Sequence, residues 1–152
     1  MSFRNGLLLL VAATLSFPAV GNAGAQEVQA LDGKWEIVFD GENIGREAEW
    51  QKTGIFQGLE PRREINVPSC WELIEKDYEG VAFYRRTFKV SKDWKGKVIR
   101  LRFDAVNFLA EVWLNDVAIG IHEGGFTPFE FRVDDVLEFN KENVLTVRVA
   151  GP

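Results

Sequence analysis

The sequence has very few of the residues that form covalent cross-links or soft metal sites, since its 152 residues include one cysteine, one histidine and one methionine. A single cysteine, Cys70, cannot form an intrachain disulfide. A single histidine, His122, cannot supply the pair of imidazoles found in many zinc sites. The sequence therefore predicts a fold held by its core and its backbone hydrogen bonds, with no metal and no other cofactor.

The motifs that mark phosphate binding and zinc proteolysis are also missing. There is no glycine-rich loop of the P-loop type and no G-x-G-x-x-G. His122-Glu123 begins like the H-E-x-x-H motif, but Phe126 stands where the second histidine must be. The formal net charge is −5, so the chain gains no counterion-release attraction to DNA or RNA. We therefore expect no nucleic-acid partner.

The residues alone give little support for nucleophilic or carboxylate catalysis. Ser69 and Ser91 lack the strand-to-helix context of a nucleophile elbow, and we expect His122 to be a turn residue that donates a hydrogen bond. Carboxylates are plentiful but scattered. No pair is identifiable as the acid and nucleophile that retaining glycosidases hold about 5 Å apart. Motif chemistry by itself predicts a non-catalytic exported domain.

The first 25 residues have the parts of a secretory signal peptide in the right order. Arg4 follows the N-terminal amine, residues 7–17 form an apolar run, and residues 23–25 (AGA) offer a cleavage site. The run is too short to cross a bilayer core of about 30 Å as a helix. We expect residues 1–25 to lie outside the fold, and residues 26–152 to be periplasmic or secreted with no membrane association after cleavage. A buried N-terminal helix and an uncleaved anchor are the alternatives. In an oxidising compartment, an unpaired Cys70 is expected to be buried.

Most of the remaining chain alternates between apolar and polar residues, as half-buried strands do. In residues 97–103, Ile99, Leu101 and Phe103 are expected to face inward while Arg100 and Arg102 face outward. The same pattern predicts strands over residues 33–39, 108–114, 117–120, 127–133 and 144–149. The positions predicted to be buried are Trp35, Phe88, Ile99, Leu101, Phe103, Val112, Leu114, Phe129, Phe131, Leu145 and Val147.

Short turns separate these predicted strands. Asn115-Asp116 supplies a turn pair that tolerates positive φ, which predicts a hairpin. Residues 42–57 show no sustained period and are predicted to be loop, with short helical turns at 71–76 and 134–137. Strands of this length and spacing predict an all-β fold, an antiparallel jelly-roll or galactose-binding-like β-sandwich formed by residues 26–152 as one domain.

Four sequence blocks, taken together and in order, carry a family resemblance. Residues 66–71 (NVPSCW) resemble a VP-x-x-W block, and residues 82–88 (AFYRRTF) resemble a W-Y-R-R-x-F strand with Phe83 in place of the usual Trp. Residues 100–106 (RLRFDAV) are similar to L-R-F-x-G/A-V. Residues 111–116 (EVWLND) and 120–129 (GIHEGGFTPF) resemble V-W-L-N-G and G-x-H-x-G-G-Y-T-P-F, with Asp116 for Gly and Phe126 for Tyr.

These blocks belong to the N-terminal domain of glycoside hydrolase family 2, the β-galactosidase, β-glucuronidase and β-mannosidase group, which the chain resembles over about residues 31–150. We interpret them mainly as a fold signature. Gly124-Gly125 permits a backbone path closed to residues with a Cβ, and Pro128 suits the start of an edge strand. Of Arg85 and Arg86, the one on the side of Tyr84 is expected to pair with a carboxylate if buried. The signature residues are Trp71, Tyr84, Arg85, Arg86, Trp113, Asn115, His122, Gly124, Gly125, Phe126, Pro128 and Phe129.

The resemblance also implies what the chain does. In the family, the catalytic glutamates lie on a TIM barrel that follows this domain and an immunoglobulin-like domain, so no catalytic residue is carried over. The chain is expected to lack the final jelly-roll strands, to be inactive alone and to be part of an exported β-glycosidase. A loop of the family domain shapes the active-site mouth and corresponds here to residues 75–80. Its candidate sugar contacts are Asp77, Tyr78 and Glu79, with a solvated loop as the alternative.

Two functional hypotheses follow. The first is the carbohydrate-binding-type domain of a hydrolase, which contacts β-linked glycosides or oligosaccharides weakly and through the full-length enzyme. The second is a free-standing carbohydrate- or protein-binding β-sandwich.

Overall fold

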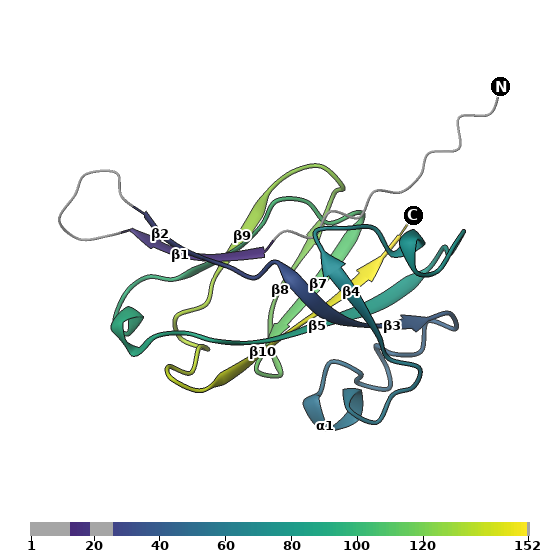
Figure 1. The fold of residues 1–152 in the computed structure, drawn as a ribbon, viewed down its shortest axis with the longest axis horizontal. Coiled ribbons are helices and arrows are strands. Elements are labelled where there is room, and N and C mark those ends of the chain that lie inside the picture. The colour runs from purple at the N-terminus through teal and green to yellow at the C-terminus, as the bar shows by residue number, and fades with distance from the viewer. Residues whose placement is uncertain (1–12, 19–25, 152) are drawn as a thin grey trace.

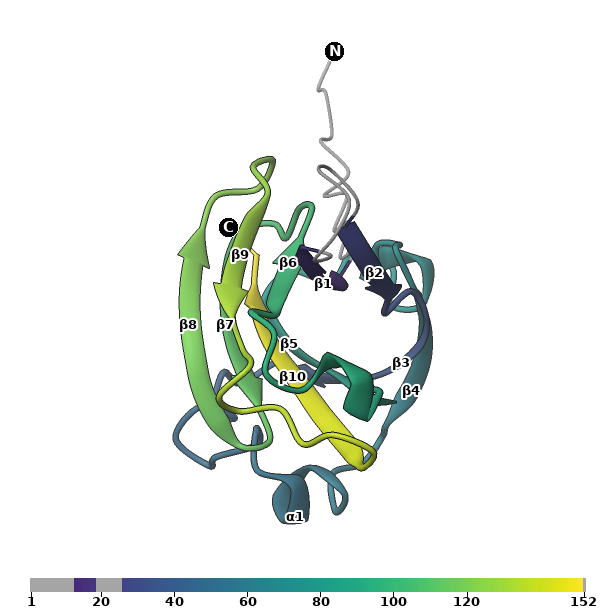
Figure 2. The ribbon, with the colours of Figure 1, turned by 90° about the vertical axis from the view of Figure 1, so that its left-hand side faces the viewer.

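The protein is a sandwich of two antiparallel sheets, seen in a computed structural model that describes residues 13–18 and 26–151. The larger sheet has the strand order β4-β3-β5-β10-β7-β8, and the smaller has the order β2-β1-β6-β9. Figure 2 places β7 and β8 on one side of the molecule and β3 and β4 on the other. The predicted all-β antiparallel sandwich is therefore confirmed (Figure 1).

The strands and short helices have the following bounds. The strands are β1 Ala13–Pro18, β2 Gln26–Ala30, β3 Gly33–Asp40, β4 Arg63–Val67, β5 Val81–Lys89, β6 Arg100–Phe103, β7 Leu109–Leu114, β8 Val117–Glu123, β9 Phe129–Arg132 and β10 Glu142–Ala150. The helical turns are α1 Thr53–Phe56, η1 Trp71–Leu73 and η2 Lys92–Trp94.

The core lies between the sheets, where the predicted alternation puts it. All the residues predicted to be buried are buried except Phe129 and Phe131, which are half-buried on the edge strand β9. On β6, Leu101 is fully buried while Arg100 and Arg102 face solvent. Two segments differ from prediction. Residues 63–67 form β4, and residues 53–56 form one helical turn within the expected loop.

The N-terminal segment differs more clearly from the sequence analysis, which placed residues 1–25 outside the fold. Residues 13–18 form β1, which pairs with β2 on one side and with β6 on the other. Leu15 lies opposite Leu101 and is fully buried. Residues 13–16 satisfy backbone groups along one edge of β6, and Leu15 covers apolar core. Arg4 and residues 7–12 and 23–25 lie outside the described residues, and signal-peptide cleavage stays a prediction.

The long connection from β3 to β4 covers part of the outer face of the larger sheet. It begins at Asp40, whose carboxylate accepts hydrogen bonds from the backbone N–H groups of Ile44 (2.9 Å) and Gly45 (2.8 Å). It then buries Phe56 against Phe83 and neighbouring apolar residues in a second, smaller core. Both faces of this sheet are thus covered where α1 lies (Figure 1).

A buried ion pair fastens this connection to the sheet. Arg148 on β10 and Glu111 on β7 lie side by side, with Nη1 and Oε2 2.5 Å apart and both side chains almost fully buried. Each also reaches the connection, since Arg148 donates to Asn43 Oδ1 (2.6 Å) and Arg46 lies 3.1 Å from Glu111. The extra partners offset the desolvation of the buried charges.

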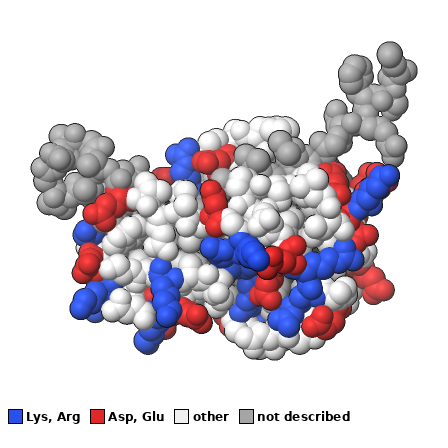
Figure 3. All heavy atoms as spheres, viewed as in Figure 1, with Lys and Arg blue, Asp and Glu red and all other residues white. Residues whose placement is uncertain are grey.

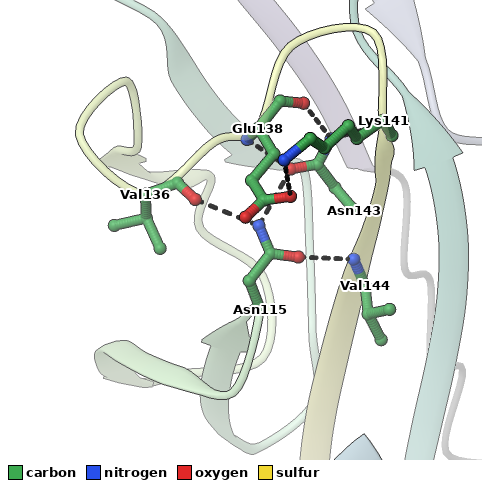
Figure 4. Close-up of polar contacts among 6 residues, drawn as sticks. All are labelled: Asn115, Val136, Glu138, Lys141, Asn143 and Val144. Atoms are coloured by element: carbon green, nitrogen blue, oxygen red, sulfur yellow. Dashed lines mark hydrogen bonds and ion pairs between the residues drawn. The ribbon is translucent and has the colours of Figure 1, made fainter.

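The β7–β8 hairpin turns at Asn115-Asp116 as predicted, with φ angles of 51° and 65°. Figure 4 shows how the Asn115 side chain joins this turn to two other segments. Its Nδ2 donates to the Val136 carbonyl (3.0 Å) and to Asn143 Oδ1 (2.9 Å), and its Oδ1 accepts from the Val144 N–H (2.9 Å). One amide therefore fixes the turn, the residues before β10 and the start of β10.

Gly124 and Gly125 follow β8 and have the backbone requirement that the sequence predicts. Gly124 has φ of +130°, and a Cβ on Gly125 would lie 2.6 Å from Asn107 Oδ1. Pro128 immediately precedes β9, an edge strand, where a missing N–H costs no ladder bond.

We expect Leu101→Ala to lower the free energy of unfolding by about 2–5 kcal/mol, because it removes a fully buried side chain opposite Leu15. The matched control is Leu73→Ala, since Leu73 is 75% exposed and its truncation should change stability by less than about 0.5 kcal/mol. Urea titration followed by tryptophan fluorescence measures both. Equal effects in the two variants would contradict the assigned core.

We expect Asn115→Ala to destabilise the protein by about 2 kcal/mol or more, because it removes the side-chain hydrogen bonds to the Val144 N–H, the Val136 carbonyl and Asn143 Oδ1, and puts alanine at positive φ. Asn66→Ala, at an exposed position on β4, is the matched control and should have little effect. Thermal unfolding followed by circular dichroism distinguishes the two. A wild-type melting midpoint for Asn115→Ala would refute the structural role.

Candidate functional site

The predicted sugar-contact loop, residues 75–80, connects η1 to β5. Its backbone turns at Asp77, which has φ of 59°, and both Asp77 and Glu79 are exposed. Tyr78 is half-buried instead, and its hydroxyl donates to the Val81 carbonyl (2.7 Å). Asp77 and Glu79 are therefore the exposed acidic residues of the loop, whereas the Tyr78 hydroxyl is used in a hydrogen bond to the neighbouring backbone.

Aromatic packing and one arginine hold this loop in place. The Tyr78 ring stands edge-on to Trp71 (5.5 Å between centroids) and to Phe39 (4.7 Å). Arg63 Nη1 donates to the Ile74 carbonyl (2.9 Å) and to Glu75 Oε2 (2.6 Å). Burial, with smaller effects from nearby carboxylates, raises the pKa of Tyr78, so the phenol stays protonated near neutral pH. The carboxylates of Asp77 and Glu79 thus project from a fixed frame.

Several aromatic signature residues are packed inside the fold. Trp71 and Tyr84 are fully buried, and Trp113 stacks on Phe83 with ring centroids 6.5 Å apart. Burial raises the pKa of Tyr84 well above its ordinary value. Phe126 differs from these aromatics because it is 84% exposed.

His122 is a strand residue, which corrects the prediction of a turn residue. It lies on β8 opposite Ala110, because β8 continues beyond the residues expected for it. Its ring stacks on Phe129 (4.0 Å between centroids), and Nε2 lies 3.3 Å from Thr127 Oγ1. The hydrogen bond beside the glycine pair is therefore present, and this surrounding favours packing over catalysis.

Cys70 is half-buried, so the expectation of full burial is wrong. Partial burial and the nearby Glu72 raise the pKa of its thiol. The thiol is therefore a weak nucleophile at neutral pH, because the thiolate is the reactive form.

A cleft that the sequence did not predict opens beside the loop, at the side of the sheet formed by β3, β4 and β5. Its volume is about 470 Å³. Figure 3 shows basic and acidic side chains interleaved over this part of the surface. The lining residues are Lys34, Trp35, Glu36, Glu60, Arg62, Arg63, Glu64, Arg85, Arg86 and Thr87.

Arg85 is the most buried charged group of this cleft, with 3% of its surface exposed. Its Nη2 donates to Thr53 Oγ1 (2.8 Å), and its guanidinium lies over the Phe56 ring, 4.9 Å from the centroid. Thr53 in turn donates to Asp116 Oδ1 (3.0 Å). Burial lowers the pKa of Arg85, although Asp116 and Glu36 oppose this effect, so Arg85 remains a cation.

A carboxylate partner was expected only for a buried arginine on the Tyr84 side, and Arg86 is half-buried. Arg86, on the Tyr84 side, donates from Nη1 to the Lys34 carbonyl and forms no ion pair with a described carboxylate. The more buried residue is Arg85, which bonds a hydroxyl. Arg62, before β4, also lines the cleft, and the sequence analysis did not predict this. The adjacent pair Arg62-Arg63, which repeats the basic pair of β5, is the signal in the sequence that indicates it.

Metal-binding clusters and membrane-spanning helices are both absent from residues 13–18 and 26–151. No group of three or more His, Cys, Asp or Glu side chains there could hold a metal ion. None of the helices described is long and apolar enough to cross a membrane.

Comparison with known proteins identifies the family. The profile described as "Glycosyl hydrolases family 2, sugar binding domain" matches residues 74–151. A β-glucuronidase of Paenibacillus borealis is 32% identical over 129 residues, which cover 82% of this chain and 21% of the relative. A β-galactosidase of Thermoanaerobacter pseudethanolicus is 41% identical over 76 residues, which cover 49% of this chain and 10% of the relative.

Solved structures agree with these relatives. A β-glucuronidase from Ruminococcus gnavus, in complex with uronic deoxynojirimycin, superposes with a TM-score of 0.76 and 30% identity, covering 86% of this chain and 22% of that one. The chain thus spans between a tenth and a quarter of the length of these relatives. The expected resemblance is confirmed, and the chain belongs to glycosyl hydrolase family 2, whose sugar-binding domain it contains.

Proposed function

We propose that this chain serves as the N-terminal sugar-binding part of an exported β-glycosidase that hydrolyses O-glycosyl bonds in carbohydrate metabolism. The family match supports the glycosidase, and the β-glucuronidases and β-galactosidases among its relatives support β-glucuronides or β-galactosides as the substrate class. Residues 1–25 support export as a signal peptide. Hydrolysis would require the catalytic acid and nucleophile of a barrel domain.

The observation that carries this proposal is the fixed shape of residues 75–80. Tyr78 and Arg63 hold the loop, so Asp77 and Glu79 need little further ordering when they bind a ligand. Ionised carboxylates accept strong hydrogen bonds from hydroxyl groups, which is what a sugar offers. The loop would thus form one side of a sugar site whose other side comes from elsewhere in the full enzyme.

A free-standing carbohydrate- or protein-binding module remains the second candidate. One observation favours it. β1, from within this chain, pairs with β6 and puts Leu15 into the core. Burial of apolar surface within the chain favours independent folding.

We expect the 152-residue chain to show no turnover of aryl β-glucuronides, β-galactosides or β-mannosides. The reaction needs a positioned acid, a positioned nucleophile and a distorted sugar between them, and we assign none of these to this chain. A chromogenic assay of the repurified protein tests this. Turnover that persists through repurification and is lost when one Asp or Glu is substituted would refute the proposal.

We expect methyl β-glycosides to bind with millimolar or weaker affinity, because a one-sided site makes few contacts against the cost of association. The variant Asp77→Asn with Glu79→Gln should weaken binding at least about threefold, since neutral acceptors form weaker hydrogen bonds. A charge-matched control is Asp135→Asn with Glu142→Gln, two exposed positions away from the loop. Calorimetric titration compares them, and sub-micromolar affinity would favour the free-standing module instead.

A further inference from the structure

The cleft beside β3, β4 and β5 carries an excess of positive charge in an acidic protein. Five Lys or Arg side chains and three Glu side chains line it, whereas the whole chain has a net charge of −5. A cleft with an excess of one sign of charge attracts ligands of the opposite sign. The excess of basic side chains therefore favours an anion in this cleft.

The glutamates of the cleft are already engaged. Glu64 pairs with Lys34 at 2.9 Å, and Arg62 lies 3.5 Å from Glu36 and 3.6 Å from Glu60. No described carboxylate forms a direct ion pair with Arg85 or Arg86, although Asp116 and Glu36 attract Arg85 from farther away. These two guanidinium groups therefore carry charge that has no direct ion-pair partner among the described residues.

Hydrogen-bond donors in the cleft are also unsatisfied. Arg85 Nη1, Arg86 Nε and Arg62 Nε are all buried and have no acceptor among the described residues. A buried donor without an acceptor costs free energy, so native proteins rarely leave three together. Arg85 is the strongest case, because it is almost fully buried and its other terminal nitrogen is fixed on Thr53. These donors suit a ligand that offers several acceptor oxygens.

The hydrogen-bond donors of the cleft indicate the chemistry of a suitable ligand. Guanidinium groups match the paired oxygens of a carboxylate, sulfate or phosphate. The three glutamates would repel a polyanion, but they can accept hydrogen bonds from neutral hydroxyl groups. The volume of about 470 Å³ is within the range of small-ligand pockets. One charged group carried on a polyhydroxylated molecule therefore fits better than an acidic peptide.

We propose that this cleft binds an acidic saccharide through its carboxylate or sulfate group, with Arg85 and Arg86 as the anion ligands. The saccharide half of the assignment rests on the proposed function, because it takes the family's sugar binding as given. The oxyanion half rests on the unpaired guanidinium groups alone. The site is separate from residues 75–80, although Arg63 lines the cleft and also holds Glu75.

The test is titration of the full chain, followed by calorimetry and by the fluorescence of the tryptophans, of which Trp35 lines the cleft. The probes are sodium sulfate, methyl β-glucuronide, a monosulfated galactoside, neutral methyl β-galactoside and a short polyglutamate peptide. We expect both acidic saccharides to bind more tightly than sulfate alone and the neutral sugar not to respond to cleft substitutions. Binding should weaken as salt rises, because the charges are partly exposed to solvent.

Three variants and a control identify the site. Arg86→Gln and Arg85→Lys should each weaken acidic-saccharide binding about tenfold or more, since each removes a charge-assisted contact or its fork geometry. Glu36→Gln should tighten it, because it removes a competing carboxylate, and this result does not depend on Arg85→Lys folding. Arg100→Gln on β6 changes the net charge by the same amount as Arg86→Gln at an exposed position and should leave binding unchanged.

Each outcome decides the proposal. Equal losses in Arg86→Gln and Arg100→Gln, or no binding of any anion by the wild type, would overturn the site. Sulfate bound as tightly as the acidic saccharides, or a tighter polyglutamate peptide, would overturn the saccharide assignment. Failure of the loop proposal is seen separately, because the affinity for the neutral sugar would then be the same in the wild type and in the variant Asp77→Asn with Glu79→Gln.

Discussion

The ion pair between Arg148 and Glu111 is the interaction on which the outer side of the larger sheet depends. It places two buried charges on that face, and Asn43 and Arg46 of the β3–β4 connection complete the arrangement. The connection is therefore tied to the sheet at a defined point. Farther along this connection, Thr53 and Phe56 lie over Arg85 and bury this arginine of β5.

The candidate sites are consequences of that covering segment. Arg85 is enclosed by this segment and still lines the cleft, and the chain then reaches β4 with Arg62 and Arg63 among the other lining residues. Arg63 then extends the same arrangement to residues 75–80 through Glu75. Polar groups that look unrelated in the sequence thus belong to one connected surface, whose rigidity comes from packed aromatic rings and paired charges.

Much of the fold was predictable because its signals are local. Residues 97–103 alternate so regularly that the inward face of β6 follows from the sequence, and Asn115-Asp116 indicates its own hairpin. β4 was not predicted, because only Ile65 and Val67 are buried among its five residues and its pairing is decided by β3. The burial of Arg85 escaped prediction for a similar reason, since residues about thirty positions earlier cover it.

β1 has a consequence for the order of events in the life of the chain. Residues 13–17 belong both to the apolar run of the expected signal peptide and to β1, which lies between β2 and β6 with Leu15 inside the core. If the N-terminal segment acts as a signal peptide, as we propose, its recognition and the pairing of β1 with β6 use the same residues and exclude each other. The proposed export would therefore require the segment to be bound by the export machinery before β1 pairs with β6.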